Sequence, residues 1–198
     1  MIGKDLPDRL TRILAVRPPN EIEAPDSDPA AVLIPLYWDR AAWHLLFTLR
    51  TEQVDAHRGQ VSFPGGRLEA SDTGPVDAAL RESEEEIGLH RQDVRILGAL
   101  DQRRTVTRFL VTPIVGVIPW PYALTPNPVE VAQTFGVPLD WLADPSHVRL
   151  QSRLPSPSRE HLSAFFFDAY EGRVIWGATA RMTLDLIALL PEESKPER

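Results

Sequence analysis

Four glutamates that stand close together are the residues of this chain best suited to chemistry: Glu82, Glu84, Glu85 and Glu86. On an α-helix, which turns about 100° per residue, Glu85 and Glu86 fall within roughly 60° of Glu82, and Glu84 falls on the far side. Like charges at this spacing repel by about 0.2–0.5 kcal/mol per pair, so a compensating partner is expected. Mg²⁺ suits this role, because it takes carboxylate, water and phosphate oxygens as ligands. The alternative is a solvated acidic helix surface.

A glycine pair and an amphipathic helix must position these carboxylates. Gly65 and Gly66 open the stretch, and the helix that carries the glutamates follows. A mostly apolar stripe lies at roughly 100° to 160° from Glu82 on this helix. The members of the stripe are Val76, Leu80, Ser83 and Ile87. We therefore predict that the stripe packs on a sheet while the carboxylates point away from it.

Residues 81–89 read RESEEEIGL, and this run is similar to the second half of the Nudix box, G-x5-E-x7-R-E-U-x-E-E-x-G-U, in which U is apolar. Two departures stand out. Ser83 replaces an apolar residue, a mild change because a small side chain can pack there. Gly66 lies one residue farther from Arg81 than in the consensus, which leaves Asp72 near the place of the first glutamate. The resemblance implies an α/β fold, a Nudix-type α/β/α sandwich with a mixed sheet.

The same resemblance implies metal-dependent hydrolysis of a diphosphate and gives roles to residues of the box. Glu82, Glu85 and Glu86 are the expected metal ligands, and Arg81 is expected to pair with a box carboxylate and hold its orientation. Nudix enzymes often add a glutamate from outside the box, so the general base stays open between Glu86 and Glu130. The alternative for Glu130 is an ordinary surface glutamate at the end of a helix.

A second resemblance covers residues 46–66, which match the spacing of L-L-T-x-R-[SA]-x3-R-x3-G-x3-F-P-G-G, the signature of the coenzyme A pyrophosphatase branch of the Nudix hydrolases. Phe47, Thr51 and Asp55 depart from it, and Asp55 reverses the charge of a signature arginine. Arg58, three residues on, is a candidate to contact the same ligand group. The expected contacts with substrate are Arg50, His57, Arg58, Gly65, Gly66 and Arg67.

The resemblance to this branch predicts a Mg²⁺ or Mn²⁺ dependent enzyme that cleaves coenzyme A or acyl-coenzyme A into 4′-phosphopantetheine and adenosine 3′,5′-bisphosphate. Asp55 keeps open a second possibility, a Nudix hydrolase for ADP-ribose or a dinucleotide. A binding module without turnover is the third, although such proteins usually lack an intact box.

Composition agrees with an ordinary globular enzyme. With 198 residues, the chain is long enough for one domain, whose core we place at about residues 31–190. A net charge of −7 argues against generic nucleic-acid binding. No apolar run reaches the roughly 18 residues of a membrane span, and the first 16 residues lack the uninterrupted apolar core of a signal peptide. The chain has no cysteine, which fits a cytoplasmic setting. A homodimer is compatible with the resemblance, but no apolar stripe singles out an interface.

Hydrophobic periodicity and turn residues also predict the remaining elements. We expect helices at residues 5–16 and 178–190, a hairpin of strands 31–38 and 43–50, and strands at 94–100 and 109–118. Residues 129–135 are expected as a short turn or helix, residues 150–160 as a loop, and residues 162–170 as pairing with residues 173–176 around a turn.

Overall fold

The computed structural model describes residues 2–51, 59–152 and 163–190. Its helices are α1 (Leu6–Val16), α2 (Pro75–Ile87), α3 (Leu139–Ala143) and α4 (Gly177–Ala188), with short 3-10 turns at Arg91–Asp93 and Pro145–His147. Its strands are β1 (Asp28–Asp39), β2 (Ala42–Arg50), β3 (Val61–Ser62), β4 (Gly65–Arg67), β5 (Arg95–Ala99), β6 (Arg103–Arg104), β7 (Phe109–Val117), β8 (Val131–Pro138), β9 (Val148–Ser152) and β10 (Ser163–Phe167).

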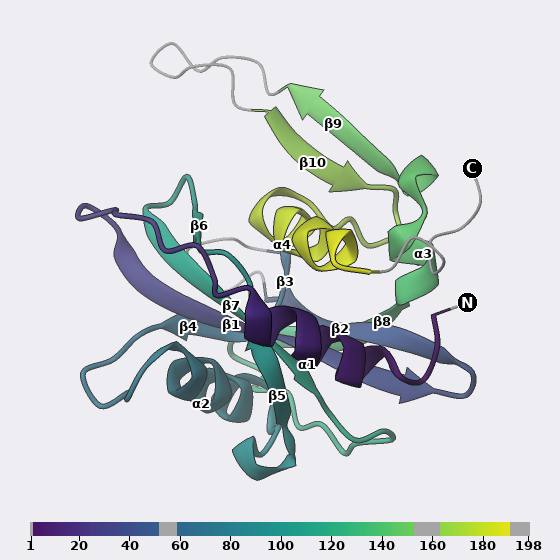
Figure 1. Cartoon of the computed structure of the whole chain (residues 1–198), viewed down its shortest axis with the longest axis horizontal. Coiled ribbons are helices and arrows are strands. Elements are labelled where there is room, and N and C mark those ends of the chain that lie inside the picture. Colours follow the sequence, from purple (N-terminus) through teal and green to yellow (C-terminus); the bar gives the residue numbers. More distant parts are fainter. Residues whose placement is uncertain (1, 52–58, 153–162, 191–198) are drawn as a thin grey trace.

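A mixed sheet of eight strands lies between two helical layers. β1 runs parallel to β7, whereas β2 and β4 pair with β1 antiparallel. α2 covers one face of the sheet and α4 covers the other, as Figure 1 shows. α1 shares its apolar cluster with α4, since Leu10 and Leu186 belong to the same buried group, while Ala79 of α2 belongs to a separate one. The predicted α/β/α sandwich with a mixed sheet is confirmed.

The short strands β3 and β4 lie between the two long strands β1 and β2. These two long strands form the predicted hairpin, but they pair with each other only from Leu36 to Asp39. Farther from the hairpin turn, β1 pairs with β4 and β2 pairs with β3. Residues 61–67 therefore occupy the space where β1 and β2 diverge, and we call this segment the wedge. It carries the glycine pair into the middle of the sheet.

Each glycine of the pair is required for a different reason. Gly65 has a φ of 152°, and a side chain there would overlap the backbone of Ala31 and Val32 on β1. Gly66 lies opposite α2, where a side chain would overlap the carboxylate of Glu82. Gly65 thus lets the wedge join β1, and Gly66 lets a glutamate of α2 approach the wedge.

Several predicted elements differ in the structure. Residues 129–135 were expected as a turn or helix, but residues from Val131 onward form β8, which pairs with β2. The expected loop at residues 150–160 begins as the end of β9, and its later residues lie outside the described part of the chain. β10 pairs chiefly with β9, and only isolated bridges link Phe166 to Trp176 and Tyr170 to Arg173. For β8 the cause is that its partner β2 is distant in sequence.

The other predicted elements are confirmed, with boundaries that differ by at most three residues: α1, α4, the β1–β2 hairpin, β5 and β7. None of the helices in the described residues is long and apolar enough to cross a membrane.

Replacing Gly65 by alanine tests the wedge. We expect Gly65→Ala to lower the free energy of unfolding by roughly 3 kcal/mol or more, because it combines backbone strain with overlap against β1. Gly74→Ala is a matched control, since Gly74 has a similar φ of 159° and open space around the added carbon. Urea unfolding measures both. Equal stability losses in the two variants would contradict the close approach at Gly65.

Candidate active site

The helix α2 ends in a way that its sequence explains. Pro75 occupies the first turn, where its missing N–H is not needed. Gly88 ends the helix in the left-handed conformation with a φ of 67°, and its N–H donates to the carbonyl of Glu84. Ser83 is fully buried, and its hydroxyl donates to the carbonyl of Ala79 at 2.7 Å. The expected packing of a small residue at this position is confirmed.

The buried face of α2 differs from the predicted stripe. Ser83 and Ile87 are buried as expected, but Val76 is 40% exposed, and the two alanines Ala78 and Ala79 are fully buried instead. The small alanines allow the helix to lie close to the sheet. Glu86 is consequently on the buried side, with 2% of its surface exposed, so the expectation that all three carboxylates point away from the sheet is wrong for this residue.

Glu86 is held by the wedge and by the end of β2. Its Oε2 accepts a hydrogen bond from the Gly65 N–H at 3.2 Å, and its Oε1 lies 3.4 Å from Nη1 of Arg50. Burial raises the pKa of Glu86 to about 7, and the negative charges of Glu82 and Glu130 act in the same direction. Arg50 and Gly65 oppose this rise without cancelling it.

Glu82 and Glu85 share the guanidinium of Arg81. Nη1 of Arg81 donates to Glu82 at 3.0 Å and to Glu85 at 3.2 Å. Its Nε and Nη2 each donate a hydrogen bond of 3.0 Å to the Asp72 carboxylate, which is almost fully buried. These bonds lower the pKa of Asp72 and raise that of Arg81. The expected pairing of Arg81 with box carboxylates is present, and Asp72 anchors it from behind.

Glu130 is brought to the same place from a distant part of the chain. The charge of Glu130 raises the pKa of both Glu82 and Glu86, although burial is the largest cause for each. The backbone around Glu130 is tied to β2, because the Thr51 N–H donates to the Glu130 carbonyl at 3.0 Å. The loop that carries Glu130 is thus tied both to β2 and, through the Asn127 N–H, to the Glu86 carbonyl at the end of α2.

Arg50 points at Glu86 because β2 is irregular at its end. The register between β2 and β8 shifts between Leu49 and Arg50, and such a bulge can re-aim a side chain. Nε of Arg50 is buried and has no hydrogen-bond partner in the described residues. An arginine with an unsatisfied donor beside a carboxylate can bind an anion that enters the site.

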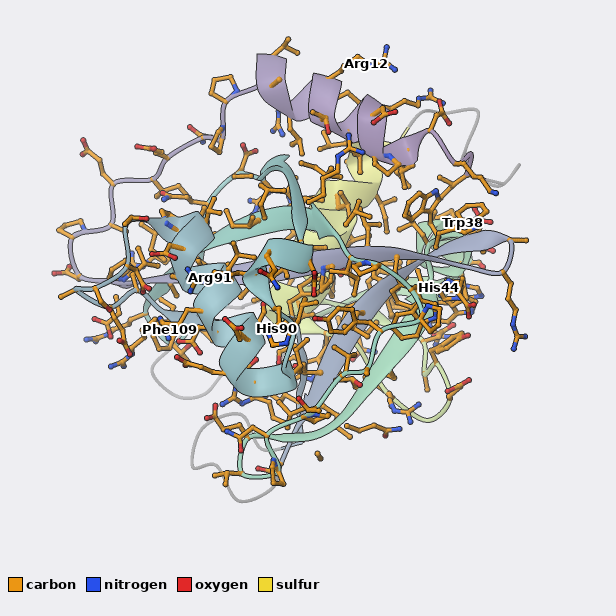
Figure 2. All side chains as sticks on the ribbon, turned by 90° about the horizontal axis from the view of Figure 1, so that it is seen from below. Arg12, Trp38, His44, His90, Arg91 and Phe109 are labelled. Carbon is orange, nitrogen blue, oxygen red and sulfur yellow. The ribbon has the colours of Figure 1, made fainter. Side chains whose placement is uncertain are left out.

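The remaining predicted contact residues do not all reach this place. The side chain of Arg67 lies over the ring of Phe109 and pairs with Asp28, on the side of the sheet that faces α1 and α4. Only its carbonyl joins the site, by accepting a hydrogen bond from Arg81. His57 and Arg58, like Asp55, lie outside the described residues. Figure 2, which looks onto α2, shows His90 and Arg91 beside this helix, where they pair with Glu84 and Asp77 on its outer side.

The donor chemistry of the site fits a divalent cation. Within the described residues no three acidic or histidine side chains converge as a preassembled metal cluster, because Glu82 and Glu85 are bound to Arg81 and Glu86 to the wedge. Carboxylate oxygens are nonetheless the ligands that Mg²⁺ and Mn²⁺ prefer. The negative charges of neighbouring carboxylates raise the pKa of Glu82 and Glu86, and a bound cation would relieve this repulsion.

Comparison with known proteins identifies the family. Residues 27–154 match the model of the NUDIX domain. The chain is a Nudix hydrolase. The NudL Nudix hydrolase of Photorhabdus laumondii is 36% identical over 167 residues, 84% of this chain and 87% of that protein. NudL of Citrobacter koseri is 35% identical over 181 residues, 91% and 92% of the two chains. Neither name states a substrate.

The fold agrees with this assignment. A MutT/nudix family protein from Enterococcus faecalis superposes with a TM-score of 0.52 at 14% sequence identity, over 94% of this chain and 73% of that one. This likeness concerns the fold alone. The family places the chain among metal-dependent pyrophosphohydrolases, and α2 with the preceding glycine pair is its Nudix box.

Sequence reasoning missed two residues that the structure brings to the site. Thr51 was noted only as a departure from a signature, yet its hydroxyl donates to the Val129 carbonyl at 2.8 Å. Asn127 was not considered, although its N–H donates to the Glu86 carbonyl at 2.8 Å. An asparagine followed by proline indicates a turn, and that signal could have placed Asn127 at a bend just before Glu130.

The Nudix hydrolase should depend on Asp72 for stability. We expect Asp72→Asn to lower the free energy of unfolding by about 2 kcal/mol at pH 7, because Arg81 loses its two charge-assisted hydrogen bonds to a largely buried carboxylate. The pKa of Asp72 is lowered in the folded state. Its contribution is therefore present above about pH 4, the ordinary pKa of aspartate, and is lost as the pH falls through the lower folded value.

Urea unfolding of both proteins from pH 7 downward measures this difference. Asp77→Asn is the control, since Asp77 pairs with the half-exposed Arg91 and should matter less. A stability difference between wild type and Asp72→Asn that grows on acidification would contradict the argument.

Proposed function

We propose that this Nudix hydrolase cleaves the diphosphate of coenzyme A or acyl-coenzyme A, giving 4′-phosphopantetheine and adenosine 3′,5′-bisphosphate, with Mg²⁺ or Mn²⁺ as cofactor. The observation that carries the proposal is the resemblance of residues 46–66 to the coenzyme A signature. Arg50, near the start of this stretch, and Gly65, near its end, both contact the Glu86 carboxylate. A cytoplasmic location and a homodimer remain predictions from the sequence.

Residues within the stretch 46–66, among them Phe47, which departs from the signature, fasten the wedge to β2. The rings of Phe47 and Phe63 stack with centroids 4.8 Å apart, and both side chains are almost fully buried. The hydroxyl of Thr48 bonds the Ser62 carbonyl at 3.1 Å and contacts the Ser62 hydroxyl at 2.9 Å. These contacts fix the position of Gly65 relative to Arg50. They support a joint role for the two ends of the signature.

Each residue has a defined task in the proposed hydrolysis. Glu82, Glu85 and Glu86 would hold the cation, which when bound neutralises charge on the diphosphate and lowers the pKa of water. Arg81, anchored by Asp72, orients Glu82 and Glu85. In the reaction the oxygen of water bonds to phosphorus, the bridging P–O bond breaks, and a carboxylate accepts the proton of the water.

The carboxylate that accepts this proton is either Glu86 or Glu130.

Arg50 would donate its unsatisfied Nε–H to a phosphate oxygen, because that donor has no partner among the described residues. Placing a positive charge there offsets the negative charge that the substrate brings beside Glu86.

A substrate panel tests the specificity. Coenzyme A, an acyl-coenzyme A, ADP-ribose and a dinucleotide polyphosphate are each incubated with the enzyme and Mg²⁺ or Mn²⁺, and products are identified by mass spectrometry. We expect coenzyme A or its acyl derivative to show the highest kcat/KM and to give the two products named above. A higher kcat/KM for ADP-ribose or the dinucleotide would overturn the substrate and leave the reaction class standing. Turnover of none of them would favour a binding module.

Glu86→Gln tests the catalytic assignment. The variant should fold normally and lose at least ~10²-fold in kcat, the lower end for removal of a catalytic group of this kind. Glu84→Gln is the matched control, because Glu84 is on the same helix and bonds His90 on its outer side. It should retain turnover near that of the wild type.

Binding of the cation alone gives an independent measurement. A ligand present at 100 times its Kd stabilises the folded state by about 2.7 kcal/mol, so Mn²⁺ should raise the Tm of the wild type and of Glu84→Gln. A smaller increase is expected for Glu86→Gln. Near-normal turnover of Glu86→Gln at saturating Mn²⁺ would sink the assignment.

A further inference from the structure

A closed ring of contacts connects Glu86 and Glu130. The Asn127 N–H donates to the Glu86 carbonyl, and the N–H of Glu130 donates to the Asn127 carbonyl at 3.0 Å. The Glu130 carbonyl accepts from Thr51, which follows Arg50, and Arg50 returns to the Glu86 carboxylate. The ring therefore joins the end of α2, the loop before β8 and the end of β2.

Asn127 holds this ring with its side chain as well as its backbone. Its Oδ1 accepts a hydrogen bond from the Val129 N–H at 3.1 Å, which closes a turn typical of asparagine. Its Nδ2 donates to Oε1 of Glu130 at 3.5 Å, a long contact that can shorten when substrate binds. In the described residues no other side-chain hydrogen bond reaches the Glu130 carboxylate.

We propose that Asn127 is a positioning residue of the active site, which holds the Glu130 carboxylate toward Glu86 by donating its side-chain amide while its backbone binds the end of α2. The inference rests on the proposed role of Glu130 in the hydrolysis. One residue therefore contacts both glutamates, the Glu86 carbonyl with its N–H and the Glu130 carboxylate with its amide.

Two features make this arrangement sensitive to Asn127. The negative charges of Glu82 and Glu86 act against that of Glu130, and the Asn127 amide is the side-chain donor that the described residues direct at the Glu130 carboxylate. The neighbouring side chain of Val129 is 62% exposed, so packing there does little to hold the loop. The loop is therefore fixed mainly by hydrogen bonds, those of Asn127 on one side and those of Thr51 on the other.

Asn127→Asp separates the two roles of the side chain. Aspartate keeps the oxygen that accepts from Val129, so the turn should persist and the Tm should stay near that of the wild type. It replaces the donor to Glu130 with a second carboxylate, and kcat at saturating Mn²⁺ should fall about tenfold or more with KM little changed. Asn20→Asp, in the loop after α1, controls for the added charge.

A double-mutant cycle with Glu130→Gln decides whether Asn127 acts through Glu130. If it does, Asn127→Asp causes a much smaller loss in the Glu130→Gln background than in the wild type. Thr51→Val, which deletes the hydroxyl bond to Val129 without adding charge, should show the same dependence with a smaller loss. This variant serves if Asn127→Asp folds poorly.

Three results would overturn the inference. If Asn127→Asp turns over normally while Glu130→Gln is slow, Asn127 has no positioning role and Glu130 keeps its own. An equal loss in both backgrounds would show that Asn127 acts without Glu130. Wild-type turnover of Glu130→Gln would remove the role of Glu130, and the inference with it, while leaving the substrate assignment to the panel.

Discussion

The burial of the Glu86 carboxylate is the constraint on which the rest of this site depends. A buried charge is costly unless other groups satisfy it, and here the partners are one backbone N–H and one guanidinium. Both come from β2 or the wedge beside it, so the sheet must diverge for the wedge to enter. Gly65 must approach β1 without a side chain, and β2 must end in a bulge that aims Arg50. Much of the local irregularity of the sheet thus serves a single carboxylate.

The buried helix face and the acidic site also constrain each other. Ala78 and Ala79 bring α2 close to β1, and this closeness places Glu86 within reach of the wedge. Larger residues at these two positions would separate helix and sheet. Asp72 and the carbonyl of Arg67 in the wedge anchor Arg81 on the other flank, so the guanidinium can hold Glu82 and Glu85. On one side of α2 the wedge and Arg50 bind Glu86, and on the other side Arg81 binds Glu82 and Glu85.

How much of this could be predicted follows from what sequence patterns encode. Spacing alone placed Glu82, Glu85 and Glu86 on one side of α2, whereas apolar runs and turn residues gave the β1–β2 hairpin and β7. A helical pattern gives only relative directions, so it could not tell that the sheet lies on the alanine side. β8 was missed because its exposed and buried residues do not alternate regularly near its start, and its pairing with β2 spans a long stretch of chain.

The contacts around Glu130 show why the second part of the site escapes prediction. The family resemblance singled out Glu130, but the residues that place it act through backbone groups, which many residue types could supply. Asn127 binds the Glu86 carbonyl through its N–H, which any residue except proline could do, and only its side-chain amide is specific. The proposed role of Glu130 therefore depends on a loop whose chemistry is largely that of the main chain. Its precision comes from being bound at both ends, to α2 and to β2, rather than from burial.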